Sequence, residues 1–340
     1  MKKVKVQEAV GAILCHDMTK IIPGEFKGRA FKKGHIITEE DIPELLNIGK
    51  EHIYIWEKKE HQAHEDEAAT YIAEKVAGAG LRLTAPCNGR VDLIADYEGM
   101  LVIDEELLFN INMVDEIVVA SLNNKRWVKK DDVIAGIRVI PIVIEKENLF
   151  KVGRYCELKK VLTIKPFRPL SVGIVTTGSE VYSGRIVDKF GPIVEQKVRG
   201  FGCVVKQKTI LPDDDGKICD AVKGMVQEGV EMVVVTGGMS VDPDDVTPAG
   251  IKKTGANIVT YGAPVLPGSM ILIAYLDGVP VLGLPGCVMY DRTTIFDLIL
   301  PMILAKKEIT KKDIVKFGMG GLCRKCRICR YPECSFGTGA

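Results

Sequence analysis

The chain has 340 residues, of which 46% are hydrophobic and 27% charged, and its formal net charge is +1. This length predicts two or three domains whose apolar cores are large enough to fold without disulfides. The near-zero charge and the aromatic fraction of 6% disfavour a nucleic-acid partner, which needs a basic surface or a row of stacking rings. No apolar run reaches membrane-spanning length and no signal peptide is evident, so we expect a cytoplasmic protein without membrane contacts.

The first part of the chain, residues 1–60, predicts a small α+β domain. Residues 31–57 contain the signals of a strand, a helix and a second strand. Thr38 is a suitable N-cap, acidic residues follow it, and Gly49 can end the helix. We therefore expect one short helix between two strands.

The second part, residues 61–165, predicts a helix over 61–80 followed by a β-rich scaffold domain. Short alternating runs separated by turn residues indicate the strands. His61 and His64 are one helical turn apart on the predicted helix and could share a metal ion. Their surroundings are polar, however, and favour a solvated helix face.

The third part, residues 166–310, predicts an α/β domain. The apolar runs SVGIVTT, CVVKQKTIL and EMVVVTGG alternate with segments that have helical signals. This alternation is typical of a mostly parallel sheet covered by helices on both faces, which makes three layers. In such a sheet the ligand site lies at the carboxyl ends of the strands.

Four polar or glycine-rich loops follow predicted strands of this domain, where that rule places a site. Glycine lets the backbone approach a ligand, and Thr and Ser hydroxyls can bind phosphate oxygens. Because several such loops follow the strands of one sheet, we favour a ligand site over unrelated turns. The loops are Thr176–Glu180, Leu211–Asp215, Thr236–Thr247, and the paired turns Pro267-Gly268 and Pro285-Gly286.

The loop after EMVVV carries the most chemical information. Its Gly237-Gly238 pair can expose amide N–H groups as an anion-binding concavity, with Ser240 close by. Asp244 and Asp245 follow, and Mg²⁺ is usually held by one or two carboxylates together with substrate phosphates. The loop thus predicts phosphate and Mg²⁺ binding, although a glycine pair followed by a helix-capping turn would give the same pattern.

The acidic run Asp213–Asp215 has a simpler interpretation. Acidic residues at the start of a helix cap its free N–H groups and interact favourably with its dipole. By itself, LPDDDG therefore predicts a helix N-cap more strongly than a ligand site.

Taken together, TTGSE, SGRIVD, PDDD, TGGMS with its following acids, and the two PG turns resemble the molybdopterin-binding domain of molybdenum-cofactor biosynthesis. The resemblance covers residues 166–305, and VKVQEAVGAILCHDMTK at the start also resembles the molybdopterin molybdotransferases. It implies the fold of that domain, a homo-oligomer, and a ligand that is molybdopterin or its adenylated form. It further implies a Mg²⁺-dependent insertion of molybdate and service to a molybdoenzyme.

The resemblance also implies roles for individual residues. Asp245 and Glu180 would be catalytic, and Asp244 and Asp245 would hold Mg²⁺. The residues implied to bind the pterin or its phosphate are Thr177, Gly178, Ser179, Asp213, Asp214, Gly237, Gly238, Ser240, Pro267, Gly268, Pro285 and Gly286.

Two departures from the family pattern keep other functions open. Family members carry a lysine beside the first PG turn, where this chain has LPGSM, and GLPGCVMY replaces their GLPGNP. One alternative is a carrier or chaperone that binds molybdopterin without turnover. Another is a pyrophosphatase acting on ADP-ribose-like nucleotides, a second family with this fold, because DDVT at Asp244–Thr247 fits its pattern.

The last part, residues 311–340, is a cysteine-rich tail. Cys323, Cys326, Cys329 and Cys334 give the spacing C-x2-C-x2-C-x4-C. Thiolates at this density favour Zn²⁺ or an iron–sulfur cluster over a disordered tail of free thiols. The spacing resembles a bacterial ferredoxin run, except that its last gap is longer by one residue, so the metal stays open.

Overall fold

The computed structural model describes residues 2–22, 24–55, 59–240, 242–305 and 308–339. The chain forms two compact units. The first comprises Met1–Asp96, Ile103–Leu122 and Lys130–Thr163, and the second Tyr97–Val102, Asn123–Lys129 and Ile164–Ala340. The domain boundaries that we predicted from the sequence stay predictions. Among the described residues, no helix is both long and apolar enough to cross a membrane.

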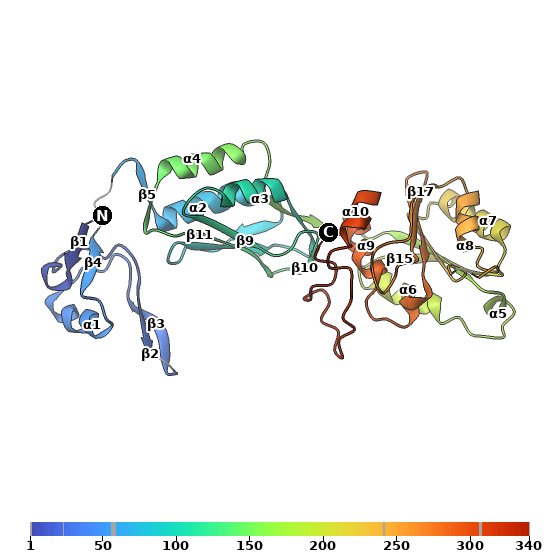
Figure 1. Ribbon diagram of the computed structural model, residues 1–340, viewed down its shortest axis with the longest axis horizontal. Helices are drawn as coiled ribbons and strands as arrows, with labels where there is room; N and C mark the ends of the chain where they lie inside the picture. Colours follow the sequence, from blue (N-terminus) through green and yellow to red (C-terminus); the bar gives the residue numbers. More distant parts are fainter. Residues whose placement is uncertain (1, 23, 56–58, 241, 306–307, 340) are drawn as a thin grey trace. The chain divides into compact units, whose positions relative to one another are not determined.

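The first unit begins with a small α+β module whose apolar core includes Leu14, Ile37 and Leu45. As predicted, Thr38 is an N-cap, and it forms a reciprocal capping box with Asp41. The module also has two antiparallel strand pairs, β1 with β4 and β2 with β3 (Figure 1). The elements are β1 (Lys2–Lys5), η1 (Val6–Glu8), β2 (Met18–Ile22), β3 (Phe26–Phe31), η2 (Glu39–Asp41), α1 (Ile42–Asn47) and β4 (His52–Ile55).

The rest of the first unit is an antiparallel sheet in the order β6-β7-β11-β9, with helices α2, α3 and α4 on one face (Figure 1). The prediction of a β-rich domain was incomplete, because α3 and α4 are helices that short alternating runs do not reveal. The elements are β5 (Gln62–His64), α2 (Glu65–Val76), β6 (Leu81–Leu83), β7 (Arg90–Ala95), α3 (Glu105–Asn112), β9 (Ile117–Ser121), β11 (Val133–Val139), β12 (Val143–Glu145) and α4 (Lys146–Tyr155).

The helix predicted over 61–80 is shorter than expected. Residues Gln62–His64 form β5, which pairs antiparallel with β12, and α2 begins only at Glu65. His64 is the N-cap of α2 and is fully buried, so the prediction of a solvated helix face was wrong for this residue. Pairing with a strand about eighty residues away overrides the local helical signal.

The second unit contains a six-stranded sheet in the order β15-β14-β16-β19-β18-β17. Strands β15, β14, β16 and β19 are parallel, while β18 and β17 are antiparallel to their neighbours. The mostly parallel sheet predicted from the sequence is thereby confirmed. The strands are β14 (Ser171–Thr177), β15 (Val204–Leu211), β16 (Met232–Thr236), β17 (Asn257–Tyr261), β18 (Leu272–Leu276) and β19 (Val279–Leu284).

Two apolar clusters, one on each face of this sheet, make the three layers. On one face Ile174 and Val234 pack with α6 and α9, and on the other Val175 and Val235 pack with α7 and α8. Consecutive strand residues alternate between the faces, and both faces are apolar because helices cover both. The helices are α5 (Ser179–Tyr182), α6 (Phe190–Arg199), α7 (Asp215–Gln227), α8 (Thr247–Lys253), η3 (Gly286–Met289), α9 (Ile295–Leu304) and α10 (Lys311–Lys316).

A smaller sheet in the order β10-β8-β13 belongs mostly to the second unit. Its strands are β8 (Gly99–Ile103), β10 (Trp127–Val128) and β13 (Leu162–Pro166). The cysteine-rich tail belongs to the same unit, because Phe336 is buried in the apolar cluster that contains α9. The tail is therefore packed against the α/β domain.

Candidate functional site

Four parallel strands end at one edge of the six-stranded sheet. Thr177 of β14 is paired in register with Leu211 of β15, and Thr236 of β16 with Leu284 of β19. The register of β14 with β16 brings these pairs level with each other. The loops singled out in the sequence therefore leave the same edge, as the rule for parallel sheets requires.

The loop after β16 lies directly against the loop after β14. Gly237 has a φ of 89°, and a Cβ atom there would lie 2.2 Å from the carbonyl oxygen of Thr177. The hydroxyls of Thr177 and Thr247 are 3.2 Å apart, which joins the loop after β14 to the start of α8. Only glycine permits this close approach, because any side chain at position 237 would collide with the neighbouring backbone.

The first PG turn approaches the same edge from the antiparallel strand β18. A Cβ atom at Gly268, whose φ is 121°, would lie 2.4 Å from Cγ2 of Ile295 at the start of α9. The second turn, Pro285-Gly286, directly follows β19 and leads into η3. Both PG turns thus lie on the β19–β18 side of β16, opposite the loop after β14.

These loops line an open cavity of about 770 Å³, which we call the strand-end cavity. Its volume lies in the range of small-molecule and cofactor sites. Eight of the residues predicted to bind the pterin, its phosphate or Mg²⁺ line it: Gly237, Gly238, Ser240, Asp245, Pro267, Gly268, Pro285 and Gly286. Its further walls include Phe190, Met239, Tyr290, Asp291, Leu322, Cys323 and Lys325.

Asp213 and Asp214 do not line the cavity, and each one stabilises a neighbouring element. Asp213 accepts a hydrogen bond from the N–H of Ser179 at 2.8 Å, which ties the loop after β15 to α5. Asp214 caps α7 by accepting from the N–H of Lys217, as the simpler interpretation of the acidic run predicted. That hydrogen bond holds the pKa of Asp214 below its usual value.

The remaining predicted residues lie at the margins of the site. Thr177 is buried beneath the loop after β16. The carboxylate of Glu180 folds back toward Gly178, at the start of α5. Asp244 is exposed in the turn before α8. Val241, in the same loop, lies outside the described residues.

Charged groups in the strand-end cavity are few. Asp245 accepts a hydrogen bond from the N–H of Asp242 at 3.1 Å, so one of its carboxylate oxygens is used within the loop. Lys325 forms an ion pair with Asp291 at 3.0 Å. Burial raises the pKa of the Cys287 thiol, which therefore stays protonated at neutral pH and is a weak nucleophile.

Sequence reasoning missed Lys325 as a residue of this site. The loop LPGSM lacks a lysine, but Leu322 pairs with Leu266 in a parallel bridge just before the PG turn. This pairing brings the tail, with Lys325, to the wall of the cavity. No local signal could have indicated this, because the two segments are more than fifty residues apart in the sequence.

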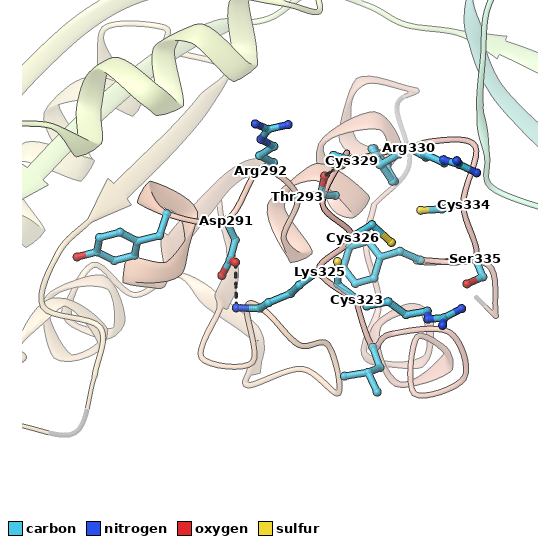
Figure 2. Close-up of a pocket in the computed structure, with 15 residues that line it drawn as sticks. Asp291, Arg292, Thr293, Cys323, Lys325, Cys326, Cys329, Arg330, Cys334 and Ser335 are labelled. Carbon is cyan, nitrogen blue, oxygen red and sulfur yellow. Dashed lines mark hydrogen bonds and ion pairs between the residues drawn. The ribbon is translucent and has the colours of Figure 1, made fainter.

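A second cavity, of about 210 Å³, lies beside the first and is lined by all four terminal cysteines (Figure 2). We call it the cysteine cavity. The strand-end cavity and the cysteine cavity share the lining residues Tyr290, Asp291, Leu322, Cys323 and Lys325. In the part of the chain that the structure describes, no three or more His, Cys, Asp or Glu side chains are grouped as ligands of one metal ion.

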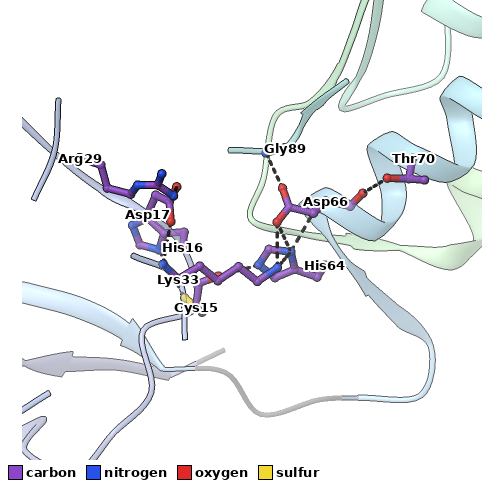
Figure 3. A network of polar contacts seen from close by, with 9 residues as sticks. All are labelled: Cys15, His16, Asp17, Arg29, Lys33, His64, Asp66, Thr70 and Gly89. Atoms are coloured by element: carbon purple, nitrogen blue, oxygen red, sulfur yellow. Dashed lines mark hydrogen bonds and ion pairs between the residues drawn. The ribbon is translucent and has the colours of Figure 1, made fainter. Parts of the chain in front are cut away.

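A polar cluster in the first unit is built differently (Figure 3). Nε2 of the buried His64 lies 2.6 Å from the carbonyl oxygen of Cys15, and Nδ1 lies 2.9 Å from Nζ of Lys33. Lys33 also donates to Asp66, whose second oxygen accepts from the N–H of Gly89. These groups bind one another, so the cluster stabilises the start of α2.

Comparison with known families gives two matches along the chain. Residues 173–305 match the family described as a probable molybdopterin binding domain, which confirms the resemblance inferred from the sequence. Residues 3–57 match a domain of unknown function (DUF8806).

Curated relatives agree with the first match. A molybdopterin molybdenumtransferase of Synechococcus elongatus is 25% identical over 156 residues, which are 43% of this chain and 38% of the relative. One from Haemophilus influenzae is 27% identical over 185 residues, or 52% and 43% of the two chains. The chain thus spans less than half the length of these relatives.

Among solved structures, a molybdopterin biosynthesis MoeA protein from Pyrococcus horikosii aligns with 90% of this chain and 74% of its own. The sequence identity is 14% and the TM-score is 0.34.

Proposed function

We propose, on the premise that residues 173–305 form a molybdopterin-binding domain, that this protein binds molybdopterin in the strand-end cavity and acts in molybdenum-cofactor biosynthesis. The observation that carries the proposal is the cavity of about 770 Å³ at the carboxyl edge of that domain's sheet. Its walls are the glycine-rich loop after β16 and the two PG turns. These three segments let backbone groups come close to a ligand and carry few charges. Such walls suit a flat heterocycle with a phosphate at one end.

The proposed reaction is insertion of molybdate into adenylated molybdopterin, with release of adenylate. Asp245 lines the cavity, and Asp244 is the residue before Asp245 in the sequence. These two carboxylates fit Mg²⁺, which is usually held by one or two carboxylates together with substrate phosphates. Bound there, Mg²⁺ would neutralise phosphate charge. Glu180, at the start of α5, stays a predicted catalytic residue without a contact that defines its role.

Lys325 is the proposed cation for the ligand's phosphate. Its side chain is 66% exposed and is paired with Asp291, so a phosphate could exchange for this carboxylate at small cost. This lysine would replace the one that family members carry beside the first PG turn. The backbone N–H groups of Gly237 and Gly238 are the other proposed phosphate ligands.

The test uses the full chain, purified anaerobically. Binding is measured by pterin fluorescence, and turnover by Mg²⁺-dependent adenylate release on addition of molybdate. We expect Asp245→Ala to lower the rate by roughly a hundredfold or more, because it removes a group that neutralises charge in the transition state. Asp220→Ala changes an exposed carboxylate of α7 outside the cavity and serves as the matched control.

Each outcome bears on the proposal. Full activity of Asp245→Ala would exclude the assigned role of this carboxylate. Tight pterin binding without turnover would replace the enzyme by the carrier hypothesis. Cleavage of ADP-ribose without pterin binding would favour the nucleotide pyrophosphatase instead.

Three further points belong to the same proposal. We propose that the protein passes its product to a molybdoenzyme, that it forms homo-oligomers, and that the four terminal cysteines hold a metal centre. The spacing of these cysteines and their common cavity support the last point.

A further inference from the structure

The four terminal cysteines surround one space. Cys323, Cys326, Cys329 and Cys334 come from twelve consecutive residues, and all line the cysteine cavity of about 210 Å³ (Figure 2). All four are free thiols. A cavity lined by four thiols is a candidate for a metal centre, since sulfur is the ligand that zinc and iron–sulfur clusters prefer.

The protein itself holds the tail in place at both ends. The N–H of Cys323 donates to the carbonyl oxygen of Leu266 at 2.8 Å, and the N–H of Gly337 donates to Gly320 at 2.9 Å. Phe336 is buried, and the hydroxyl of Tyr331 donates to the carbonyl oxygen of Asp297 at 2.9 Å. The cysteines are therefore presented by an ordered loop that closes on itself.

The long last gap of the motif is taken up by a turn. The N–H of Glu333 donates to the carbonyl oxygen of Arg330 at 2.6 Å, which bends the chain between Cys329 and Cys334. Cys334 consequently lines the same cavity as the first three cysteines. The extra residue that separates this motif from a ferredoxin run does not remove its fourth cysteine from the site.

The arrangement of the four thiols distinguishes the two candidate metals. Tetrahedral zinc lies about 2.3 Å from each thiolate, so four such ligands leave no room between them beyond the ion. Among the described residues, no three of these cysteines are grouped as ligands of one metal ion, although all four line the same cavity. A four-iron, four-sulfide cubane fills a space of this kind, because each thiolate binds a different iron atom.

Charge and hydrogen bonding favour the same occupant. A cubane held by four thiolates carries a net negative charge. The cavity is lined by four cations, Arg292, Arg324, Lys325 and Arg330, and by one carboxylate, Asp291. The hydroxyl of Thr293 lies 3.2 Å from the sulfur of Cys329, where it can donate to a cluster ligand.

We propose that the cysteine cavity binds a [4Fe–4S] cluster through Cys323, Cys326, Cys329 and Cys334. The cluster lies in the wall of the strand-end cavity, because Cys323 and Lys325 line both spaces. This inference builds on the proposed metal centre and does not depend on pterin binding. It would hold even if the strand-end cavity took another ligand.

The test is anaerobic reconstitution of the full chain with ferrous iron and sulfide, followed by metal analysis and Mössbauer spectroscopy. We expect equal amounts of iron and acid-labile sulfide and the spectrum of a cubane. Cys326→Ser and Cys329→Ser should each lower the bound iron by roughly tenfold or more. Cys287→Ser, which changes a thiol of the strand-end cavity only, should retain the full amount.

A parallel arm offers the chain Zn²⁺ alone. Binding of one zinc ion per chain, lost in Cys326→Ser, together with failure to assemble iron and sulfide, would overturn the proposal. Failure of the unaltered chain to bind either would overturn it as well. Melting curves of the cysteine variants separate a lost cluster from a lost fold, and the spectrum of the unaltered chain decides independently of them.

Discussion

The strand-end cavity and the His64 cluster both gather polar groups, but they use them in opposite ways. Around His64, each polar atom faces another polar atom of the chain, from Cys15 through Lys33 to Asp66 (Figure 3). Around the strand-end cavity, glycines and prolines bring backbone to the edge of an open space. A cluster whose groups bind one another stabilises a fold, whereas backbone arranged around a cavity prepares a place for a ligand.

Of the substitutions that compare these two regions, Gly237→Ala should have the largest effect on ligand binding. The new Cβ atom would lie 2.2 Å from the carbonyl oxygen of Thr177, so the loop must move. We expect pterin affinity to fall by at least about tenfold, because the amides proposed to bind the phosphate move with the loop. Titration by pterin fluorescence measures this loss.

Gly278→Ala is the matched control for that substitution. Gly278 has a φ of 80°, similar to that of Gly237, but a Cβ atom there meets nothing within 4 Å. Gly278→Ala should lower the free energy of unfolding by about 1 kcal/mol through backbone strain, but it should leave pterin affinity unchanged. Equal affinity of both variants would mean that close approach of the two loops does not matter for binding.

Removal of the His64 side chain should affect stability and leave intrinsic pterin affinity unchanged. His64→Ala leaves the carbonyl oxygen of Cys15 without its buried partner, whereas Lys33 keeps its ion pair with Asp66, so the expected cost is about 1–3 kcal/mol. Urea unfolding and hydrogen exchange of the α2 amides report the loss. His61→Ala, at a side chain that is 65% exposed, should change stability by less than about 0.5 kcal/mol.

The smallest expected effect concerns Glu65, the first residue of α2. Burial raises the pKa of this carboxyl from 4.5 to about 6, and Asp66 beside it acts in the same direction. The folded state therefore binds the proton more tightly than the unfolded state. The stability that this proton contributes is complete below pH 4.5 and is lost as the pH rises through 6.

Glu65→Gln tests this linkage, because glutamine resembles the protonated carboxyl and does not titrate. At pH 8 we expect it to stabilise the protein by about 1–2 kcal/mol, and near pH 4 to change little. Urea unfolding across this pH range provides the measurement. A variant that keeps the wild-type decline between pH 4.5 and 6 would assign that decline to another group.

Many residues that line the strand-end cavity could be singled out from the sequence because their signals are local. A buried strand followed by Gly237-Gly238 or Pro285-Gly286 can be recognised from adjacent residues alone. The same holds for Asp214, which caps the helix that follows it. His64 could not be placed, since its burial depends on Cys15, forty-nine residues earlier. The position of Lys325 at the cavity could not be predicted for the same reason, because it depends on the pairing of Leu266 with Leu322.

The burial of Phe336 bears on how the protein can be divided for expression. The family match ends at residue 305, yet Ile314, Phe317 and Phe336 complete the apolar cluster beneath the sheet. Each such side chain contributes roughly 1.5–3 kcal/mol through burial. A truncation at the family boundary would expose that cluster to solvent, invite aggregation and remove one wall of the strand-end cavity. The smallest piece suitable for crystallisation or ligand screening therefore extends through the cysteine tail.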